Sequence, residues 1–124
     1  MSLTKLHVKI DNQKYPIIIG SGVINELPKL LKENSIDFNK CLLVVDANVP
    51  KKIIKKILKF LKKKNLSTYY FIASEINKNQ KSIDKIISIL LKKNFNRNDC
   101  LISIGGGITG DVSGFAASIF KRGI

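Results

Sequence analysis

The chain has 124 residues, of which 44% are hydrophobic, and it carries a formal net charge of +13 at pH 7. This length and apolar content fit one ordinary folded domain and exclude a disordered tail or a fibrous repeat. No segment approaches the roughly 18 consecutive apolar residues of a membrane span, and the opening residues lack the apolar run of a signal peptide. We therefore expect a cytoplasmic protein that has no membrane partner.

The positive charge is concentrated in one segment. Eight lysines lie between Lys51 and Lys64, where the pattern predicts an amphipathic helix, so one solvated face supplies most of the excess. Lysine clusters can also bind polyanions by releasing counterions from nucleic acid. A phosphate-polymer binder therefore stays open as an alternative, which steeply salt-dependent retention on DNA would support, although we expect no nucleic-acid partner.

The N-terminal segment predicts a β-hairpin. Leu6, Val8 and Ile10 alternate with polar residues, residues 11–13 supply a turn, and an extended apolar run follows from Tyr15 to Ile19.

Helices and strands are then expected in alternation. Apolar residues three and four apart predict helices over residues 23–33, 50–64, 82–93 and 110–120. Short apolar runs predict strands over residues 41–45, 67–73 and 101–104. This order predicts a Rossmann-like α/β fold, with a mostly parallel sheet, flanking helices and an N-terminal hairpin. We expect one incomplete, truncated domain over residues 1–124.

The cysteines and the single histidine offer no obvious metal site. Cys41 and Cys100 each lie in a strand-like apolar run, far apart in the sequence and with no second ligand nearby, so we expect buried, reduced thiols. His7 lies on the first expected strand, where a surface or packing role is the simpler interpretation.

Ligands of open parallel sheets bind beyond the carboxyl ends of the strands, where loops lead into helices. Three loops stand out in these positions: Asp46-Ala47-Asn48, the asparagine- and lysine-containing segment that ends at Lys81, and Gly105 to Asp111.

The third loop is the most informative, because Gly105, Gly107 and Gly110 match G-x-G-x-x-G between an expected strand and an expected helix. Glycines let a backbone approach a pyrophosphate, and a helix N-terminus offers free N–H groups and a positive dipole end. Alone the match is weak, since tight packing also demands such turns. Asp111 departs from the usual fingerprint, because a carboxylate beside phosphates is unfavourable unless it caps the helix or binds a ligand hydroxyl.

The run from Gly105 to Ser118, continued by Lys121-Arg122-Gly123-Ile124, resembles the signature of 3-dehydroquinate synthase, whose usual form is GGGxxGDxxGFxAxxxxRG. The opening strands, the Asp-x-Asn at Asp46 and Lys81-Ser82 follow in the order and spacing of that family. The resemblance covers essentially the whole chain and points to the N-terminal NAD-binding portion of the enzyme.

The resemblance implies a lyase that depends on NAD and on a divalent metal, zinc or cobalt. Such an enzyme converts 3-deoxy-D-arabino-heptulosonate 7-phosphate into 3-dehydroquinate and phosphate, in the shikimate pathway to chorismate and the aromatic amino acids. Hydride returns to the substrate, so NAD is a recycled cofactor.

The resemblance also assigns site residues by motif position. The residues implied to line the NAD site are Asp46, Asn48, Lys81, Gly106, Gly107, Ile108, Thr109, Gly110 and Asp111. Arg122 matches an arginine that reaches the substrate phosphate, in this family across the interface of a homodimer, and a guanidinium fork suits that task.

Two departures from the family pattern matter. Lys78 stands where the family usually has the glutamate of Gly-Glu-x-x-Lys-Ser, which holds a ribose hydroxyl, and Glu75 could substitute only if the loop rearranged. The family's metal ligands, a glutamate and two histidines, belong to a later helical domain that these residues do not include. We therefore expect no synthase activity from this chain by itself.

Other interpretations stay open. Other sugar-phosphate cyclases and the metal-dependent enzymes similar to glycerol dehydrogenase share related glycine loops. The chain could also be a nucleotide-binding module without catalysis, which tight NAD binding would favour.

Overall fold

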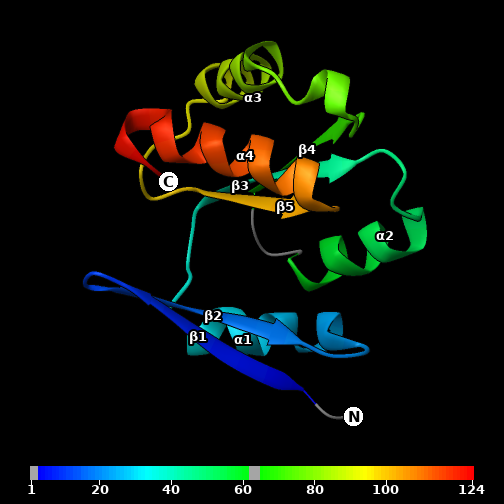
Figure 1. Ribbon diagram of the computed structural model, residues 1–124, viewed down its shortest axis with the longest axis vertical. Helices are drawn as coiled ribbons and strands as arrows, with labels where there is room; N and C mark the ends of the chain where they lie inside the picture. The colour runs from blue at the N-terminus through cyan, green and yellow to red at the C-terminus, as the bar shows by residue number, and fades with distance from the viewer. Residues whose placement is uncertain (1–2, 62–64) are drawn as a thin grey trace. The chain divides into compact units, whose positions relative to one another are not determined.

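The computed structural model describes residues 3–61 and 65–124 (Figure 1). The chain divides into two compact units, one ending at Ile36 and the other running from Asp37 to Ile124. No helix in these two described ranges is long and apolar enough to cross a membrane.

The first unit opens with the expected hairpin. Strands β1 (Thr4–Ile10) and β2 (Gln13–Ile19) pair antiparallel, from Thr4 opposite Ile19 to Ile10 opposite Gln13. The turn is shorter than the sequence predicted, because pairing already begins at Gln13. Asp11 takes the left-handed backbone conformation, with φ 53°, that a tight two-residue hairpin turn requires.

A helical segment completes this unit. The sequence predicted one helix over residues 23–33, whereas the structure has a 3₁₀ turn, η1 (Val23–Glu26), followed by α1 (Leu27–Glu33). The physical reason is Pro28 in the first turn of α1, because proline has no N–H to donate to the preceding turn.

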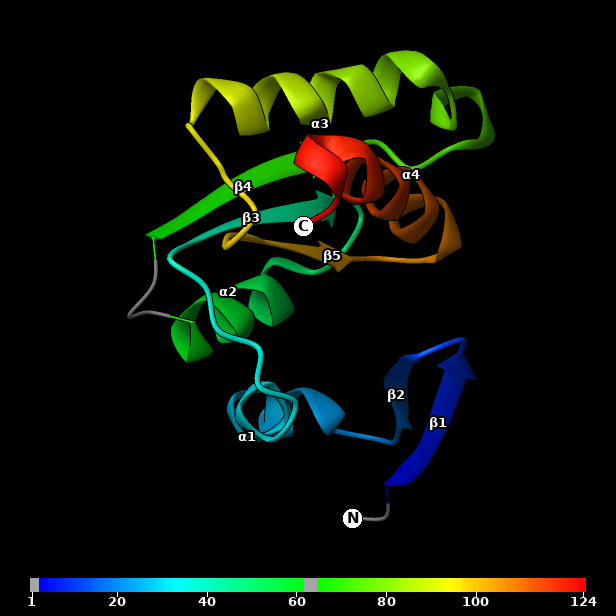
Figure 2. The same ribbon diagram turned by 90° about the vertical axis from the view of Figure 1, so that its left-hand side faces the viewer.

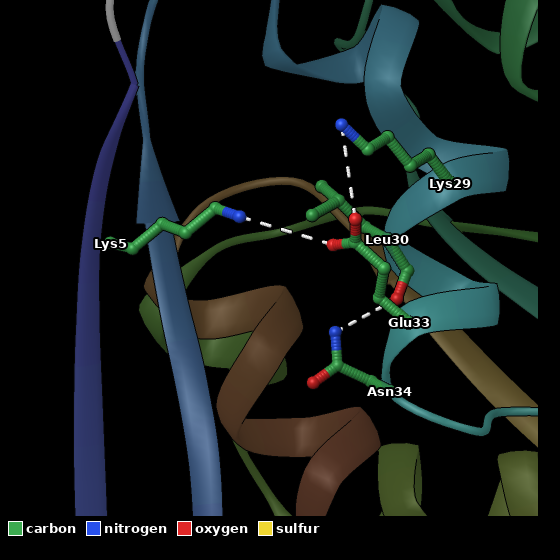
Figure 3. Close-up of polar contacts among 5 residues, drawn as sticks. All are labelled: Lys5, Lys29, Leu30, Glu33 and Asn34. Carbon is green, nitrogen blue, oxygen red and sulfur yellow. Dashed lines mark hydrogen bonds and ion pairs between the residues drawn. The ribbon is translucent and has the colours of Figure 1, made fainter.

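Polar contacts link α1 to the hairpin (Figure 3). The Glu33 carboxylate lies 3.9 Å from Lys5 Nζ on β1 and 3.8 Å from Lys29 Nζ on its own helix. The Leu30 carbonyl oxygen accepts hydrogen bonds from Asn34 Nδ2 at 2.8 Å and from the Asn34 N–H at 3.1 Å, which close the end of the helix. Both ion pairs are exposed to solvent, so each stabilises the unit by about 1 kcal/mol or less.

The second unit is a three-layer α/β structure. Its elements are β3 (Lys40–Asp46), α2 (Lys51–Phe60), β4 (Asn65–Phe71), η2 (Glu75–Asn77), α3 (Gln80–Lys92), β5 (Cys100–Ile104), α4 (Gly107–Ile119) and η3 (Phe120–Arg122). The strands lie in the order β4-β3-β5 and are all parallel. Helices α3 and α4 cover one face of the sheet and α2 covers the other (Figure 2). The predicted parallel sheet with flanking helices and an N-terminal hairpin is confirmed.

The core of this unit follows from the alternation of side chains along β3, the central strand. Leu42 and Val44 are fully buried in the cluster that α3 and α4 form on the sheet. The intervening residues of the strand point to the opposite face, where Ile54 and Ile57 of α2 are buried. A strand covered on both faces is what the continuous apolar run predicted.

Some boundaries differ from the predictions. Strand β4 occupies residues 65–71 rather than 67–73, and α4 starts at Gly107 rather than Gly110. Helix α2 begins at Lys51, because Pro50 has the extended backbone of an N-cap residue rather than of a first helical residue. Residues 62–64 of the predicted lysine-rich helix lie outside the described residues.

A buried carboxylate fixes the start of β3. Asp99 Oδ1 accepts a hydrogen bond from the Lys40 N–H at 2.9 Å, and Asp99 Oδ2 accepts one from the Asn96 N–H at 2.7 Å. The Lys40 ammonium donates to the carbonyl oxygens of Lys93 and Asn94, both at 2.9 Å, and so satisfies acceptors at the end of α3. Both the backbone N–H and the side-chain ammonium of Lys40, the first residue of β3, are therefore bound by the segment after α3. These bonds fix where β3 begins.

The cysteines are free, as expected, but they are neighbours. Although the two residues are far apart in the sequence, Cys41 on β3 pairs in register with Cys100 on β5. Strand pairing brings together residues that the sequence separates. Cys41 is buried, whereas Cys100 is only partly buried.

The two thiols should differ in reactivity. The hydrogen bond to the Cys100 sulfur, together with burial, raises the pKa of Cys41, and the same hydrogen bond lowers the pKa of Cys100. Since the thiolate is the nucleophile, we expect a disulfide reagent at neutral pH to modify Cys41 at least about tenfold more slowly than Cys100. Peptide mapping after timed labelling, with Cys100→Ser as control, measures both rates. Equal rates in the folded chain would contradict the prediction.

Candidate nucleotide-binding site

The predicted loops meet at one edge of the sheet. Because the three strands are parallel, their carboxyl ends lie side by side, at Asp46, Phe71 and Ile104. The Ala47 N–H donates to the Phe71 carbonyl oxygen at 2.8 Å, which joins the loop after β3 to the end of β4. Lys81 is the second residue of α3, so it starts from the same edge.

The glycine loop packs directly on the loop after β3. Gly105 has φ 155°, a conformation that L side chains rarely adopt. A Cβ at this position would come within 2.9 Å of the Asp46 Cβ and of Thr109 Oγ1. Only glycine therefore fits between β5 and α4 at this point.

The other glycines of the loop face open space. A Cβ placed on Gly106, Gly107 or Gly110 would meet no atom within 4 Å. Here the lack of side chains leaves the backbone accessible rather than relieving a clash. A ligand can therefore approach the N–H groups of the first turn closely.

Helix α4 offers these N–H groups without competition. Its N-cap residue is Gly106, and no side chain caps the helix. Helix N-termini carry unsatisfied N–H groups and a partial positive charge, which together favour an anion.

An unpartnered oxygen lies in the same turn. Thr109 is fully buried, and among the described residues its Oγ1 has no hydrogen-bond partner. The Ser113 hydroxyl donates to the Thr109 carbonyl oxygen and lies 3.1 Å from the Ser103 hydroxyl, so this neighbouring hydroxyl is satisfied. Buried polar atoms normally have partners, and leaving one without costs about 1–3 kcal/mol. A ligand that hydrogen-bonds Thr109 would recover this cost.

The loop after β3 is held by its own side chain. Asp46 Oδ1 accepts a hydrogen bond from the Asn48 N–H at 2.9 Å, and the Val49 N–H donates to the Asp46 carbonyl oxygen at 3.0 Å. Asn48 itself is exposed. The tight turn keeps Asp46 against the glycine loop.

The loop after β4 is fixed by two side-chain caps. Ser74 Oγ accepts from the Asn77 N–H at 3.3 Å, and Asn79 Oδ1 accepts from the Ser82 N–H at 2.9 Å. Beside this loop lies a cleft of about 480 Å³. Its lining residues are Tyr69, Asn77, Asn79, Lys81, Ser82, Asp84 and Lys85.

Lys78 lies between these caps and extends to the glycine-loop helix. Its Nζ is 3.1 Å from Asp111 Oδ2 on α4. The Asp111 carboxylate, and more weakly Glu75, raises the pKa of Lys78. The carboxylate that seemed misplaced beside a phosphate site thus has a cationic partner, which sequence reasoning missed because the two residues belong to different loops.

Comparison with known proteins shows which proteins the chain resembles. The family model for the N-terminal part of 3-dehydroquinate synthase matches residues 68–124. The chain is 64% identical, over its full length, to 3-dehydroquinate synthase of Pelagibacter ubique (strain HTCC1062), and it covers 34% of that protein. Over its whole length, the chain is therefore similar to a part of the 3-dehydroquinate synthases.

More distant relatives align in the same way. Over the whole chain, identity to 3-dehydroquinate synthase of Prochlorococcus marinus subsp. pastoris is 36%, with 35% of that protein covered. The chain therefore spans about a third of the length of these 3-dehydroquinate synthases.

Solved structures share the fold. A 2-deoxy-scyllo-inosose synthase, crystallised with carbaglucose-6-phosphate, NAD⁺ and Co²⁺, superposes on 98% of this chain and 33% of its own, with a TM-score of 0.84 and 21% identity. ValA, a 2-epi-5-epi-valiolone synthase from Streptomyces hygroscopicus with NAD⁺ and Zn²⁺ bound, superposes on 94% of this chain and 32% of its own, with a TM-score of 0.73 and 18% identity. At identities of 21% and 18%, these structures show that the fold is shared, and nothing beyond the fold.

One family position lies apart from the rest. Arg122 is in η3, beyond the C-terminal end of α4, with φ 70°. The 13 residues of α4 separate it from the glycine loop by about 20 Å along the helix axis. Within residues 3–61 and 65–124, no three side chains of the metal-binding types His, Cys, Asp or Glu gather into a possible metal site.

Proposed function

We propose that this chain supplies the NAD-binding part of a 3-dehydroquinate synthase, a lyase of the shikimate pathway that acts on 3-deoxy-D-arabino-heptulosonate 7-phosphate. The observation that carries the proposal is the buried, unpartnered Thr109 hydroxyl in the first turn of an uncapped helix. The bound NAD⁺ in both solved neighbours supports it, as does the 64% identity to a 3-dehydroquinate synthase.

The residues present fit a dinucleotide. The backbone N–H groups of Gly107 and Ile108 would hold the pyrophosphate, and the Thr109 hydroxyl would donate to it. Asp46 and Lys81 would contact the ligand from the neighbouring loops. Asn48 and Asp111 would lie at the edge of the binding site. When bound, NAD would accept a hydride from the substrate and return it later in the same cycle. The role of these side chains is to bind and orient it.

The remaining parts of the proposal concern the whole protein. We propose that Arg122 contacts the phosphate of the sugar-phosphate substrate, across the interface of a homodimer, where a guanidinium can bind two oxygens at once. We also propose a cytoplasmic location and a divalent metal, zinc or cobalt. Among residues 3–61 and 65–124, no three side chains of the metal-binding types gather to hold such an ion.

Calorimetric titration of the chain with NAD tests the proposal. We expect saturable binding that inorganic pyrophosphate competes away. Thr109→Val keeps the shape but removes the hydroxyl, so we expect NAD to bind about tenfold more weakly, which corresponds to roughly 1.4 kcal/mol.

The matched control is Thr109→Ser, which retains the hydroxyl and should bind NAD nearly as well as the original chain. Thermal unfolding without NAD should show no loss of stability in Thr109→Val, because that variant also removes an unsatisfied buried oxygen. Unchanged NAD affinity in Thr109→Val would refute the assigned role of Thr109.

A further inference from the structure

The pair formed by Lys78 and Asp111 bears on how the site accepts an anion. Asp111 is the fifth residue of α4, so its negative charge lies within two turns of the helix N-terminus. An anion at that terminus and the Asp111 carboxylate repel each other. The Lys78 ammonium, 3.1 Å from Asp111 Oδ2, offsets that repulsion.

The pair does not serve mainly as a stabilising contact. The Lys78 side chain is 45% exposed and the Asp111 side chain 64% exposed. Exposed pairs of this kind add little to folding stability, because solvent screens them and ordering the side chains costs entropy. Their charges nevertheless act on any anion that binds nearby.

The backbone on either side of Lys78 is held in place. Ser74 caps the 3₁₀ turn before it and Asn79 caps α3 after it. The ammonium therefore extends from an anchored loop toward α4, and the ion pair joins the loop after β4 to the glycine-loop helix.

A buried polar atom without a partner lies in the same part of α4. Thr109, two residues before Asp111, is fully buried with its hydroxyl oxygen unpartnered among the described residues. A Cβ placed on Gly107 or Gly110 would meet no atom within 4 Å.

We propose that Lys78 is a positioning residue of the nucleotide site. By pairing with Asp111 it neutralises the carboxylate in the first two turns of α4, so that the pyrophosphate of a dinucleotide is accepted. This inference rests on the proposed function. Lys78 departs from the family pattern, and under this proposal it contributes to nucleotide binding in this chain.

Inorganic pyrophosphate is the sharpest probe, because it has no ribose and reports the charge balance alone. We expect Lys78→Gln to weaken pyrophosphate binding roughly fivefold, because the Asp111 carboxylate then repels the anion without a compensating positive charge. Asp111→Asn should strengthen pyrophosphate binding. The double variant Lys78→Gln/Asp111→Asn should bind within about twofold of the original chain, because the two charges offset each other.

Lys92→Gln is the matched control, since it removes the same charge in the last turn of α3, at the other end of that helix. Titrations with pyrophosphate and NAD, and thermal unfolding of each variant, complete the experiment. The inference is overturned if the original chain binds both probes and Lys78→Gln behaves like Lys92→Gln. If the original chain binds neither probe, the proposed function fails and this inference fails with it.

Discussion

Replacing Gly105 with alanine is expected to destabilise the second unit by about 2–4 kcal/mol and to abolish NAD binding. Gly105 has φ 155°, and a Cβ there would lie 2.9 Å from the Asp46 Cβ, 2.9 Å from Thr109 Oγ1 and 3.0 Å from Thr109 Cβ. These atoms belong to the last residue of β3 and to the first turn of α4. Relief of the clash must therefore separate the two segments that would hold the nucleotide.

Gly106→Ala is the matched control. Its backbone has φ −88°, which alanine adopts readily, and a Cβ there would meet no atom within 4 Å. We expect its midpoint of thermal unfolding to lie within a few degrees of the original, since 1 kcal/mol corresponds to roughly 4–8 °C in a domain of this size. NAD affinity should still fall, because the methyl group enters the space above the loop.

Thermal unfolding and calorimetric titration of both variants separate packing from ligand access. Gly105→Ala should lose stability and binding together, whereas Gly106→Ala should lose mainly binding. An unfolding midpoint for Gly105→Ala equal to that of the original chain would contradict the packing argument.

The fold was largely predictable from the sequence because its signals are local. The apolar run that became β3 is continuous, and a strand covered on both faces requires such a run. The apolar residues of α3 recur three and four positions apart, which is the period of a helix packed on one side. The exact start of α4 was not predictable, because glycines that open a helix and glycines that form a loop look the same in a sequence.

The site was only partly predictable. The motif identified the loop, and the parallel topology explains why Asp46 and Lys81 start from the same edge as Gly105. Contacts between separate loops have no local signal. Lys78 and Asp111 are 33 positions apart, and the pairing of Cys41 with Cys100 depends on strand register.

The unpartnered Thr109 hydroxyl is likewise a property of packing. Threonine in the first turn of a helix is ordinary in a sequence, and only the fold shows that the oxygen is enclosed. The same is true of Asp99, whose two carboxylate oxygens accept hydrogen bonds from the N–H groups of Lys40 and Asn96. In both cases the role of the side chain depends on its burial, which is a property of the folded chain and not of the local sequence.

The largest stability effect should come from Phe95→Ala. Phe95 follows α3, is 1% exposed and belongs to the cluster with Leu42, Ile86 and Leu90 that joins α3 to the sheet. Truncating a buried phenylalanine removes apolar contacts and leaves a cavity, so we expect a loss of about 3–5 kcal/mol in the free energy of unfolding. Small domains have only about 5–15 kcal/mol in total, so a substantial unfolded fraction should appear at 37 °C.

Phe115→Ala makes the same chemical change on α4, where the residue is 51% exposed, and should cost about 1 kcal/mol or less. Phe95→Leu retains most of the buried volume and should recover much of the loss. Urea unfolding of the three variants measures the differences directly. Because the carboxyl ends of β3 and β5 carry the loops of the proposed site, NAD affinity should fall in Phe95→Ala in step with the unfolded fraction. Equal costs for Phe95→Ala and Phe115→Ala would show that this cluster does not hold α3 and the sheet together.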